Sequence, residues 1–405
     1  MEQTRWRQAL WHLSSYWRRL DATRLFLLLL AVGEAAFLFL VLFLGEEAFL
    51  SVFFRRCADQ YMDFFHSLRD ASRGAAVYSE RRVIYPPLAN AILWLIGRAL
   101  PDYYLQTSKE IGIVLWRHLP AAMLAYLFFA VFSLVALALF LREEPHGAWQ
   151  SRALAVLLPL SLPFLFMLER GNVVVLALLP LLLYMRYYDD KRPLARELGL
   201  LALALSAALK LYPALFGLCL LRDRRYRDAL RSAGYALLLF VLPSFFFGGP
   251  FFSAYWLIRN TLSYSGQTGA NAVGLVTALG GSDALGRVLL LAAYLLLFGF
   301  VVVYTLAEPL LWRRFAVIGA ALLTLSSVFS LYNWVLLLPA LLLFLRGGRP
   351  KGTEWVYFWA LSLPFALFLP KVWQDNLLIA LLSLLLFFAF LRLIYLIKQG
   401  AKHPS

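Results

Sequence analysis

Eight charged or titratable side chains lie close together in the segment between the first two long apolar runs of the sequence. Carboxylates and an imidazole in such a cluster can move protons, and arginines can bind an anion. Charged groups beside membrane-length apolar runs are costly unless they meet water or one another, so a dense cluster there often marks a functional site. The eight residues are Asp63, His66, Arg69, Asp70, Arg73, Glu80, Arg81 and Arg82.

Asp63 is the member of this cluster best suited to accept a proton. A Tyr and a Met precede it and two Phe follow it, so its surroundings would partly desolvate the carboxylate and make it a stronger base. Such a group can take a proton from a hydroxyl. The structural alternative is a helix N-cap or an ion-pair partner of Arg69 or Arg73.

Two further polar elements interrupt apolar runs later in the chain. Lys210 is followed closely by Pro213, which disrupts a helix. A cation at such a break can bind a phosphate or a carboxylate, or it can extend to the membrane interface. The turn Glu169-Arg170-Gly171-Asn172 could hold a local ion pair or contribute to ligand binding.

The composition indicates what surrounds these residues. The chain is 62% hydrophobic with a mean hydropathy of +0.72, whereas ordinary domains are about 45–50% apolar. Apolar runs of membrane-spanning length recur throughout. The net charge of +15 could suggest nucleic acid, but Lys and Arg gather at the ends of apolar runs, as the positive-inside rule expects. No Walker loop, dinucleotide fingerprint or zinc-spaced cluster is present, so a nucleotide-powered mechanism has no support.

We therefore predict an all-α, polytopic transmembrane bundle of about twelve hydrophobic segments with both termini in the cytoplasm. Residues 1–24 are predicted to form a cytoplasmic amphipathic helix, 25–397 the transmembrane catalytic domain, and 398–405 a cytoplasmic tail. Outer loops are expected at about 45–119 and 248–283.

The first outer loop is expected to contain a helix at Pro86–Leu100, too short to span a bilayer. The segments on either side of Lys210 are also short and could be half-helices that meet inside the membrane. In this layout the polar residues without an obvious structural duty collect on the outer side, where they could surround one cavity. They are Asp63, His66, Arg81, Arg82, Tyr85, Glu169, Arg170, Asn172, Lys210, Tyr212, Arg259, Asn260, Tyr264, Gln267, Asn271, Tyr332 and Asn333.

In this order, these elements resemble the GT-C superfamily of membrane glycosyltransferases. The resemblance is closest to glycosyltransferase family 87, which includes polyprenyl-phosphate-mannose-dependent mannosyltransferases. The segments that carry it are Met62-Asp63-Phe64, Tyr85–Leu88, Arg170–Asn172, Leu209–Pro213 and Gln267–Asn271.

The resemblance implies a hexosyltransferase that moves one sugar, with mannose favoured, from a polyprenyl-phosphate donor to an outward-facing lipid-linked or glycan acceptor. The reaction would invert the anomeric centre, with Asp63 as general base. The donor phosphate would be bound by Lys210, Arg170, Arg82 and His66. Residues expected at the sugar or acceptor are Tyr85, Asn172, Tyr212, Arg259, Gln267, Asn271 and Tyr332. A monophosphate donor lessens the need for a metal, and we expect no metal and no other cofactor.

The sequence departs from the family at two places. The first outer loop is more basic than is usual, which fits an anionic acceptor or contacts with lipid headgroups. The segment Gly266–Gly269 also differs from the usual Asn-Gln-Ser pattern.

Two other classes of protein compete with this interpretation. A solute or lipid transporter would place ionisable residues on broken helices, and a glycan ligase or polymerase would use a polyprenyl-diphosphate carrier. The basic bias is compatible with a bacterial inner membrane, where the site would lie on the outer face, and nucleic acid is not expected as a partner.

Overall fold

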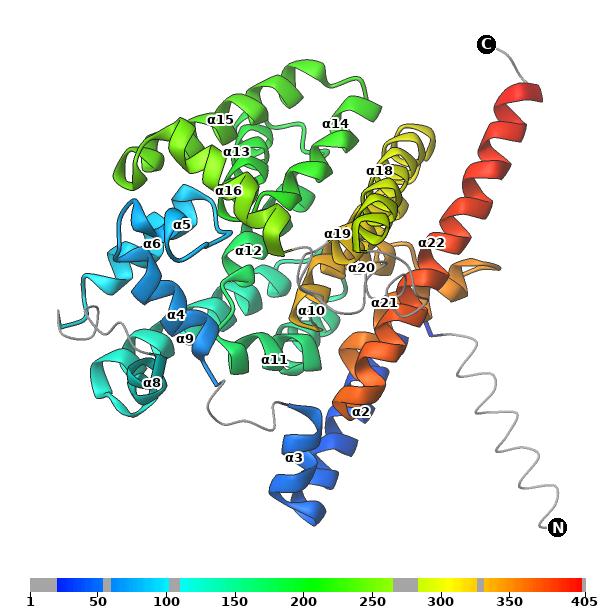
Figure 1. Ribbon diagram of the computed structural model, residues 1–405. Coiled ribbons are helices and arrows are strands. Elements are labelled where there is room, and N and C mark those ends of the chain that lie inside the picture. The colour runs from blue at the N-terminus through cyan, green and yellow to red at the C-terminus, as the bar shows by residue number, and fades with distance from the viewer. Residues whose placement is uncertain (1–19, 54–59, 102–109, 265–282, 326–330, 403–405) are drawn as a thin grey trace.

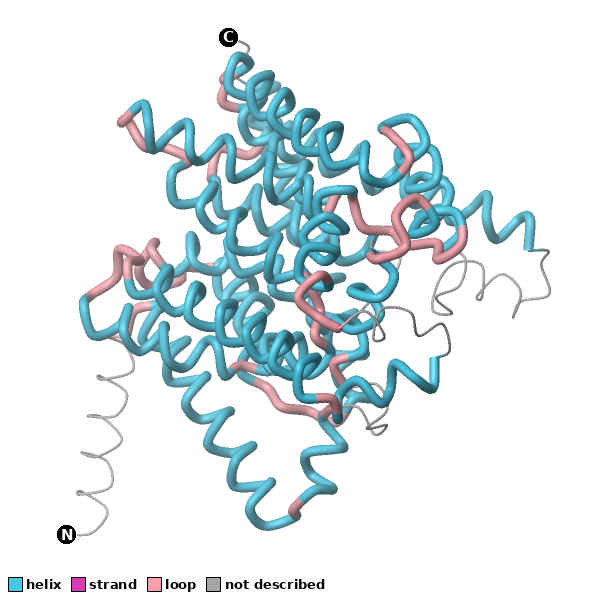
Figure 2. Tube along the Cα trace, turned by 90° about the vertical axis from the view of Figure 1, so that its left-hand side faces the viewer, coloured by secondary structure: helices cyan, strands magenta, loops and turns pink. Residues whose placement is uncertain are grey.

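The computed structural model describes residues 20–53, 60–101, 110–264, 283–325 and 331–402. Within these ranges the chain is built from helices joined by turns and loops and contains no strand (Figures 1 and 2). The all-α prediction is therefore confirmed for the part that is described. The predicted N-terminal amphipathic helix falls almost entirely in residues 1–19, which lie outside it.

In the described part of the chain, four helical segments are long and apolar enough to cross a membrane. They are α2 (Ala22–Leu44), α9 (Pro120–Arg142), α15 (Tyr226–Ser244) with the adjoining turn to Phe247, and α22 (Lys371–Lys402). The pair Ala148–Leu160 and Leu162–Arg170, bent by 45°, would make a fifth. A helix can cross a bilayer because its backbone polar groups bond to one another. Because of these apolar helices, we describe the protein as an integral membrane protein. The count of about twelve segments stays a prediction.

The remaining helices are shorter or less continuously apolar. They are α3 (Glu46–Val52), α4 (Met62–Ala71), α5 (Ala76–Ser79), α6 (Pro87–Gly97), α8 (Glu110–Val114), α10 (Ala148–Leu157), α11 (Leu162–Arg170), α12 (Val174–Tyr187), α13 (Pro193–Leu209), α14 (Leu218–Arg222), α16 (Pro250–Tyr264), α18 (Asp283–Ala307), α19 (Leu311–Leu325), α20 (Leu338–Leu345) and α21 (Glu354–Ala366). Short 3₁₀ segments within the described ranges connect them: η2 (Leu115–His118), η3 (Leu158–Leu160), η4 (Tyr212–Gly217), η5 (Phe245–Phe247) and η6 (Leu331–Leu337).

Local sequence explains several of these boundaries. The side chain of Asp21 caps α2 by accepting a hydrogen bond of 2.8 Å from the backbone N–H of Arg24. Helix α2 therefore begins at Ala22, three residues before the predicted start at residue 25. Helix α6 begins with Pro87 in its first turn, where a proline costs no hydrogen bond. Its 11 residues extend only about 16 Å. The predicted helix at Pro86–Leu100 is thus present and too short to span.

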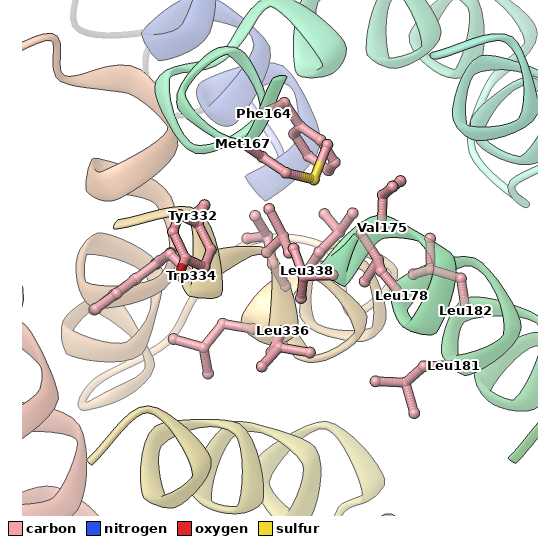
Figure 3. Close-up of a cluster of buried hydrophobic side chains, with 14 of the residues drawn as sticks. Phe164, Met167, Val175, Leu178, Leu181, Leu182, Tyr332, Trp334, Leu336 and Leu338 are labelled. Atoms are coloured by element: carbon pink, nitrogen blue, oxygen red, sulfur yellow. The ribbon is translucent and has the colours of Figure 1, made fainter. Parts of the chain in front are cut away.

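Part of the main buried core lies where α11 and α12 meet η6 and α20 (Figure 3). Phe164 and Met167 of α11 point toward Leu178 of α12 and Leu338 of α20 in this view. All four side chains are almost completely buried. Because protein interiors are close-packed, this core fixes the relative positions of the elements that end at the polar cavity described below.

Some helix-end arginines bind buried carboxylates inside the bundle. The carboxylate of Glu144, which follows α9, is fully buried. It accepts a hydrogen bond of 3.2 Å from Arg186 of α12 and one of 2.7 Å from Arg346, which follows α20. The cluster ties three helices together, so not every basic residue at a helix end serves only to orient the protein in the membrane.

Helices α4, α5 and α6 belong to the segment between α2 and α9 that contains the charged cluster, and they lie together on the left of Figure 1. Helix α6 packs against α4, α13 and α15. The charged segment is therefore folded onto the bundle, beside the end of α13.

Candidate active site

The turn between α11 and α12 meets the beginning of α4. Gly171 ends α11 in the left-handed region, with φ +69°. A Cβ at this position would lie 2.8 Å from Cβ of Phe64 and 3.2 Å from the carbonyl oxygen of Tyr61. The backbone N–H of Tyr61 donates a hydrogen bond of 2.8 Å to the carbonyl oxygen of Glu169. Glycine is thus required twice, for its positive φ and for the close approach of α4.

This contact brings Asp63 between the two residues that flank Gly171. Arg170 donates a hydrogen bond of 2.5 Å from Nη2 to Oδ1 of Asp63, and Asn172 donates one of 2.8 Å from Nδ2 to Oδ2. The Oδ1 atom of Asn172 accepts a bond of 3.0 Å from the backbone N–H of Val174, at the start of α12. Both carboxylate oxygens of Asp63 therefore have a donor, and the orientation of the Asn172 amide is set by its two partners.

Asp63 is not the N-cap of α4, and it does form an ion pair, but its partner is Arg170 and not Arg69 or Arg73. The N-cap position of α4 is Tyr61, and no side chain caps this helix. Arg69 instead pairs with Asp70, with 2.8 Å between Nε and Oδ1. The partners of Asp63 come from more than a hundred residues away in the sequence.

These residues line a cavity of about 650 Å³. Nine of the twelve residues predicted from the sequence to form the site lie along it: Asp63, His66, Arg82, Tyr85, Arg170, Asn172, Lys210, Tyr212 and Tyr332. They come from α4, the segment before α6, the turn between α11 and α12, the break after α13 and the beginning of η6. A cavity of this size lies within the usual range for small-molecule sites.

Of the other three predicted site residues, the structure describes only Arg259. Arg259 lies on α16 with its guanidinium 4.7 Å from the ring centroid of Trp256, and it is absent from the lining. Its neighbour Asn260 is buried and donates hydrogen bonds to the carbonyl oxygens of Tyr78 and Val83. Gln267 and Asn271 lie outside the described residues.

Other lining residues had no assigned role in the sequence prediction. They are Ser67, Asp70, Arg81, Val83, Ile84, Leu211, Thr261 and Asn333. Helical spacing could have found two of them, since Ser67 and Asp70 follow Asp63 by four and seven residues and so share its face of α4. Arg81 and Asn333 were among the polar residues expected to surround one cavity, whereas Val83, Ile84, Leu211 and Thr261 leave no comparable local pattern.

Lys210 stands at the predicted helix break, which the structure confirms. Helix α13 ends at Leu209, Lys210 is extended with φ −146° and ψ +127°, and η4 begins at Tyr212. The Nζ of Lys210 lies 5.8 Å from the ring centroid of Tyr85 and 5.4 Å from that of Tyr212. Among the residues that the structure describes, no carboxylate lies within ion-pair distance of this ammonium group. Tyrosine faces attract a cation but leave its N–H donors available to an anion.

The cavity as a whole is cationic. Three arginines and one lysine line it (Arg81, Arg82, Arg170 and Lys210), against the two carboxylates of Asp63 and Asp70. Arg82 is exposed and held at φ +54°, an uncommon conformation for a residue other than glycine. Burial raises the pKa of Tyr85 far above its usual range, and the nearby charge of Asp63 acts in the same direction. Its hydroxyl is therefore protonated and able to donate a hydrogen bond.

No group of three or more His, Cys, Asp or Glu side chains is arranged to hold a metal ion within the described part of the chain. The expectation of a metal-free reaction remains a prediction from the sequence.

The fold and the site together define a membrane protein with a polar, cationic cavity within an apolar helical bundle. The comparison with protein families makes the assignment specific. The family model of glycosyltransferase family 87 matches residues 83–331, more than half of the chain, and the protein belongs to this family of membrane glycosyltransferases. No curated protein and no solved structure matches the chain.

The matched stretch contains the turn at Gly171 and the break at Lys210, and it begins after Asp63. The resemblance inferred from the sequence is thus confirmed at the level of the family. A sugar donor, an acceptor and membrane lipids are the partners that a membrane glycosyltransferase requires.

Proposed function

We propose that this protein transfers a single hexose, with mannose favoured, from a polyprenyl-phosphate donor to a hydroxyl of a lipid-linked or glycan acceptor. The observation that carries the proposal is the position of Asp63. This carboxylate lines the cavity next to Arg170, and the lining also contains the ammonium group of Lys210. A base and fixed cations around one space are what transfer from a phosphate leaving group needs.

In the proposed reaction, Asp63 takes the proton of the acceptor hydroxyl. The acceptor oxygen attacks the anomeric carbon of the sugar and forms the new C–O bond. The bond between that carbon and the phosphate oxygen breaks, and its electron pair leaves with the polyprenyl phosphate. A single displacement of this kind inverts the anomeric centre.

The leaving phosphate gains a negative charge in this step. Preorganised cations in a water-poor site stabilise such a charge without a proton donor. We assign this role to Lys210 and Arg170, with Arg82 and His66 at the same cavity. Tyr85, Tyr212 and Tyr332 are proposed to contact the sugar or acceptor.

Asn172 was expected to contact the acceptor, but this residue is only 2% exposed, and its side chain is bonded to Asp63 and to the backbone of α12. We therefore propose that it positions the base. Arg259, Gln267 and Asn271 stay in the proposal as acceptor residues on the basis of the sequence alone. The enzyme is proposed to lie in a bacterial inner membrane, with about twelve hydrophobic segments, its site on the outer face and both termini in the cytoplasm.

A transporter is the second candidate because of the chain break at Lys210. Broken helices with a cation at the break are typical of transporter binding sites. The two activities differ in their products, since transport leaves the substrate unchanged.

The test is sugar transfer in proteoliposomes from labelled polyprenyl-phosphate mannose to a membrane lipid extract. The native protein is compared with Asp63→Asn and with Glu197→Gln, a change of an ion-paired carboxylate that is absent from the cavity lining. We expect the label to enter a new glycolipid with the native protein and with Glu197→Gln, and not with Asp63→Asn.

Transfer that is equal for Asp63→Asn and the native protein would contradict the assignment of the base. No transfer from this donor or from its glucose, galactose and arabinose counterparts, together with movement of unchanged tracer across the membrane, would favour a transporter. Transfer only from a diphosphate carrier would indicate a ligase or polymerase.

A further inference from the structure

Each oxygen of the carboxylate proposed as the base accepts one hydrogen bond in this structure. Oδ1 accepts from Arg170 at 2.5 Å and Oδ2 from Asn172 at 2.8 Å. Each oxygen keeps a further lone pair, which an acceptor hydroxyl can use. A hydroxyl that approaches Asp63 must nevertheless share the carboxylate with the guanidinium of Arg170, so the two compete for its negative charge.

The two partners of Asp63 differ in burial and in the length of their side chains. Asn172 is almost completely buried, and its Oδ1 is bonded to the backbone N–H of Val174, so its Nδ2 is held toward Asp63. The side chain of Arg170 is 19% exposed and lines the cavity together with Lys210. A guanidinium on a long flexible stem, with five N–H donors, can turn from one anion to another beside it.

The reaction proposed above moves negative charge in a direction that Arg170 can follow. Asp63 begins as an anion and becomes neutral when it takes the proton. The phosphate, which begins as a singly charged diester, leaves with one more negative charge. A cation within reach of both groups stabilises the products best when it lies on the phosphate.

We propose that Arg170 exchanges partners, from Asp63 in the free enzyme to the donor phosphate in the complex, so that binding of the donor releases the base. Asn172 keeps its hydrogen bond and holds the released carboxylate in place as a positioning residue. This inference rests on the proposed function. It implies an order of events in which the donor binds before the acceptor hydroxyl can be deprotonated.

The exchange can be measured by binding, without any sugar transfer. The probe is polyprenyl phosphate, which is titrated into the full-length protein in lipid nanodiscs. If the phosphate must draw Arg170 away from Asp63, the change Asp63→Asn removes that competition and tightens binding. We expect a dissociation constant about tenfold lower, equivalent to about 1.4 kcal/mol.

Loss of the Asp63 charge would also reduce its direct repulsion of the phosphate, and a double-mutant cycle separates the two effects. In an Arg170→Gln background the repulsion persists but the exchange is absent. We expect Asp63→Asn to change affinity less than about twofold in that background. Arg170→Met, which keeps the apolar stem of the side chain, replaces Arg170→Gln if thermal unfolding shows that the latter is not folded. Glu197→Gln, at an exposed ion pair that is absent from the cavity lining, is the control, and it should leave affinity unchanged with and without Arg170.

Two results would overturn the exchange while leaving the proposed donor intact. One is binding of polyprenyl phosphate that Asp63→Asn leaves unchanged, and the other is equal tightening in the Arg170 and Arg170→Gln backgrounds. If the native protein and all variants fail to bind polyprenyl phosphate, the proposed donor class is wrong and the exchange falls with it.

Discussion

The turn at Gly171 offers a test of how closely the base must be positioned. Gly171→Ala adds one methyl group to a residue at φ +69°. A left-handed conformation costs a residue with a Cβ about 1–2 kcal/mol. The new Cβ would also stand 2.8 Å from Cβ of Phe64 and 3.3 Å from its backbone nitrogen. Overpacking of this kind costs about 1–3 kcal/mol.

Together these costs amount to about 2–5 kcal/mol, and the turn can relieve them only by moving away from α4. Arg170 and Asn172 move with it, because they flank Gly171 and carry the donors to Asp63. A misplacement of about 1 Å at reacting groups can lower a rate about 100-fold. We therefore expect Gly171→Ala to lower sugar transfer by about this factor, together with a loss of thermal stability.

The assay is the initial rate of transfer from labelled donor, with thermal unfolding of the same preparations. Gly352→Ala is the matched control because Gly352 also has a positive φ, +50°, but a Cβ added there would have no neighbouring atom within 4 Å. It should lose stability through backbone strain alone and keep the native rate of transfer. A Gly171→Ala enzyme with the native rate would refute the reasoning that this turn positions the base.

The site and the bundle support three further predictions. Asp63→Asn should lower transfer about 10²–10⁴-fold, the usual contribution of a general base, while retaining binding of polyprenyl phosphate; full activity in the radiolabel assay would exclude it as the base. Lys210→Met should weaken binding of polyprenyl phosphate about tenfold or more, and Lys210→Arg should weaken it less because it keeps a cation for the phosphate. Unchanged affinity in both variants would make the lysine a structural anchor. Glu144→Gln should lower the free energy of unfolding by about 3–5 kcal/mol because it leaves two arginines without the buried carboxylate that they bind. Glu197→Gln, at an exposed pair, should lower it by less than about 1 kcal/mol. Equal shifts in thermal unfolding would contradict this difference.

The sequence by itself determined the class of the protein and the local features of its site. Apolar runs of membrane length predict a helical bundle because a bilayer leaves backbone groups no other partners. Pro213 and Gly171 mark a helix break and a helix end by their own stereochemistry, which does not depend on the rest of the chain. The charged cluster of α4 was visible for the same reason, since a charge in an apolar sequence is a local property.

Only the tertiary structure decided what each of these residues contacts. For Asp63 the sequence offered Arg69 or Arg73, which are nearby in the chain, but the partner of Arg69 is Asp70. The partners of Asp63 are Arg170 and Asn172, which reach it because α4 packs onto the turn at Gly171. Such a choice depends on how helices distant in sequence fit together, and packing is a property of the assembled core that no single segment encodes.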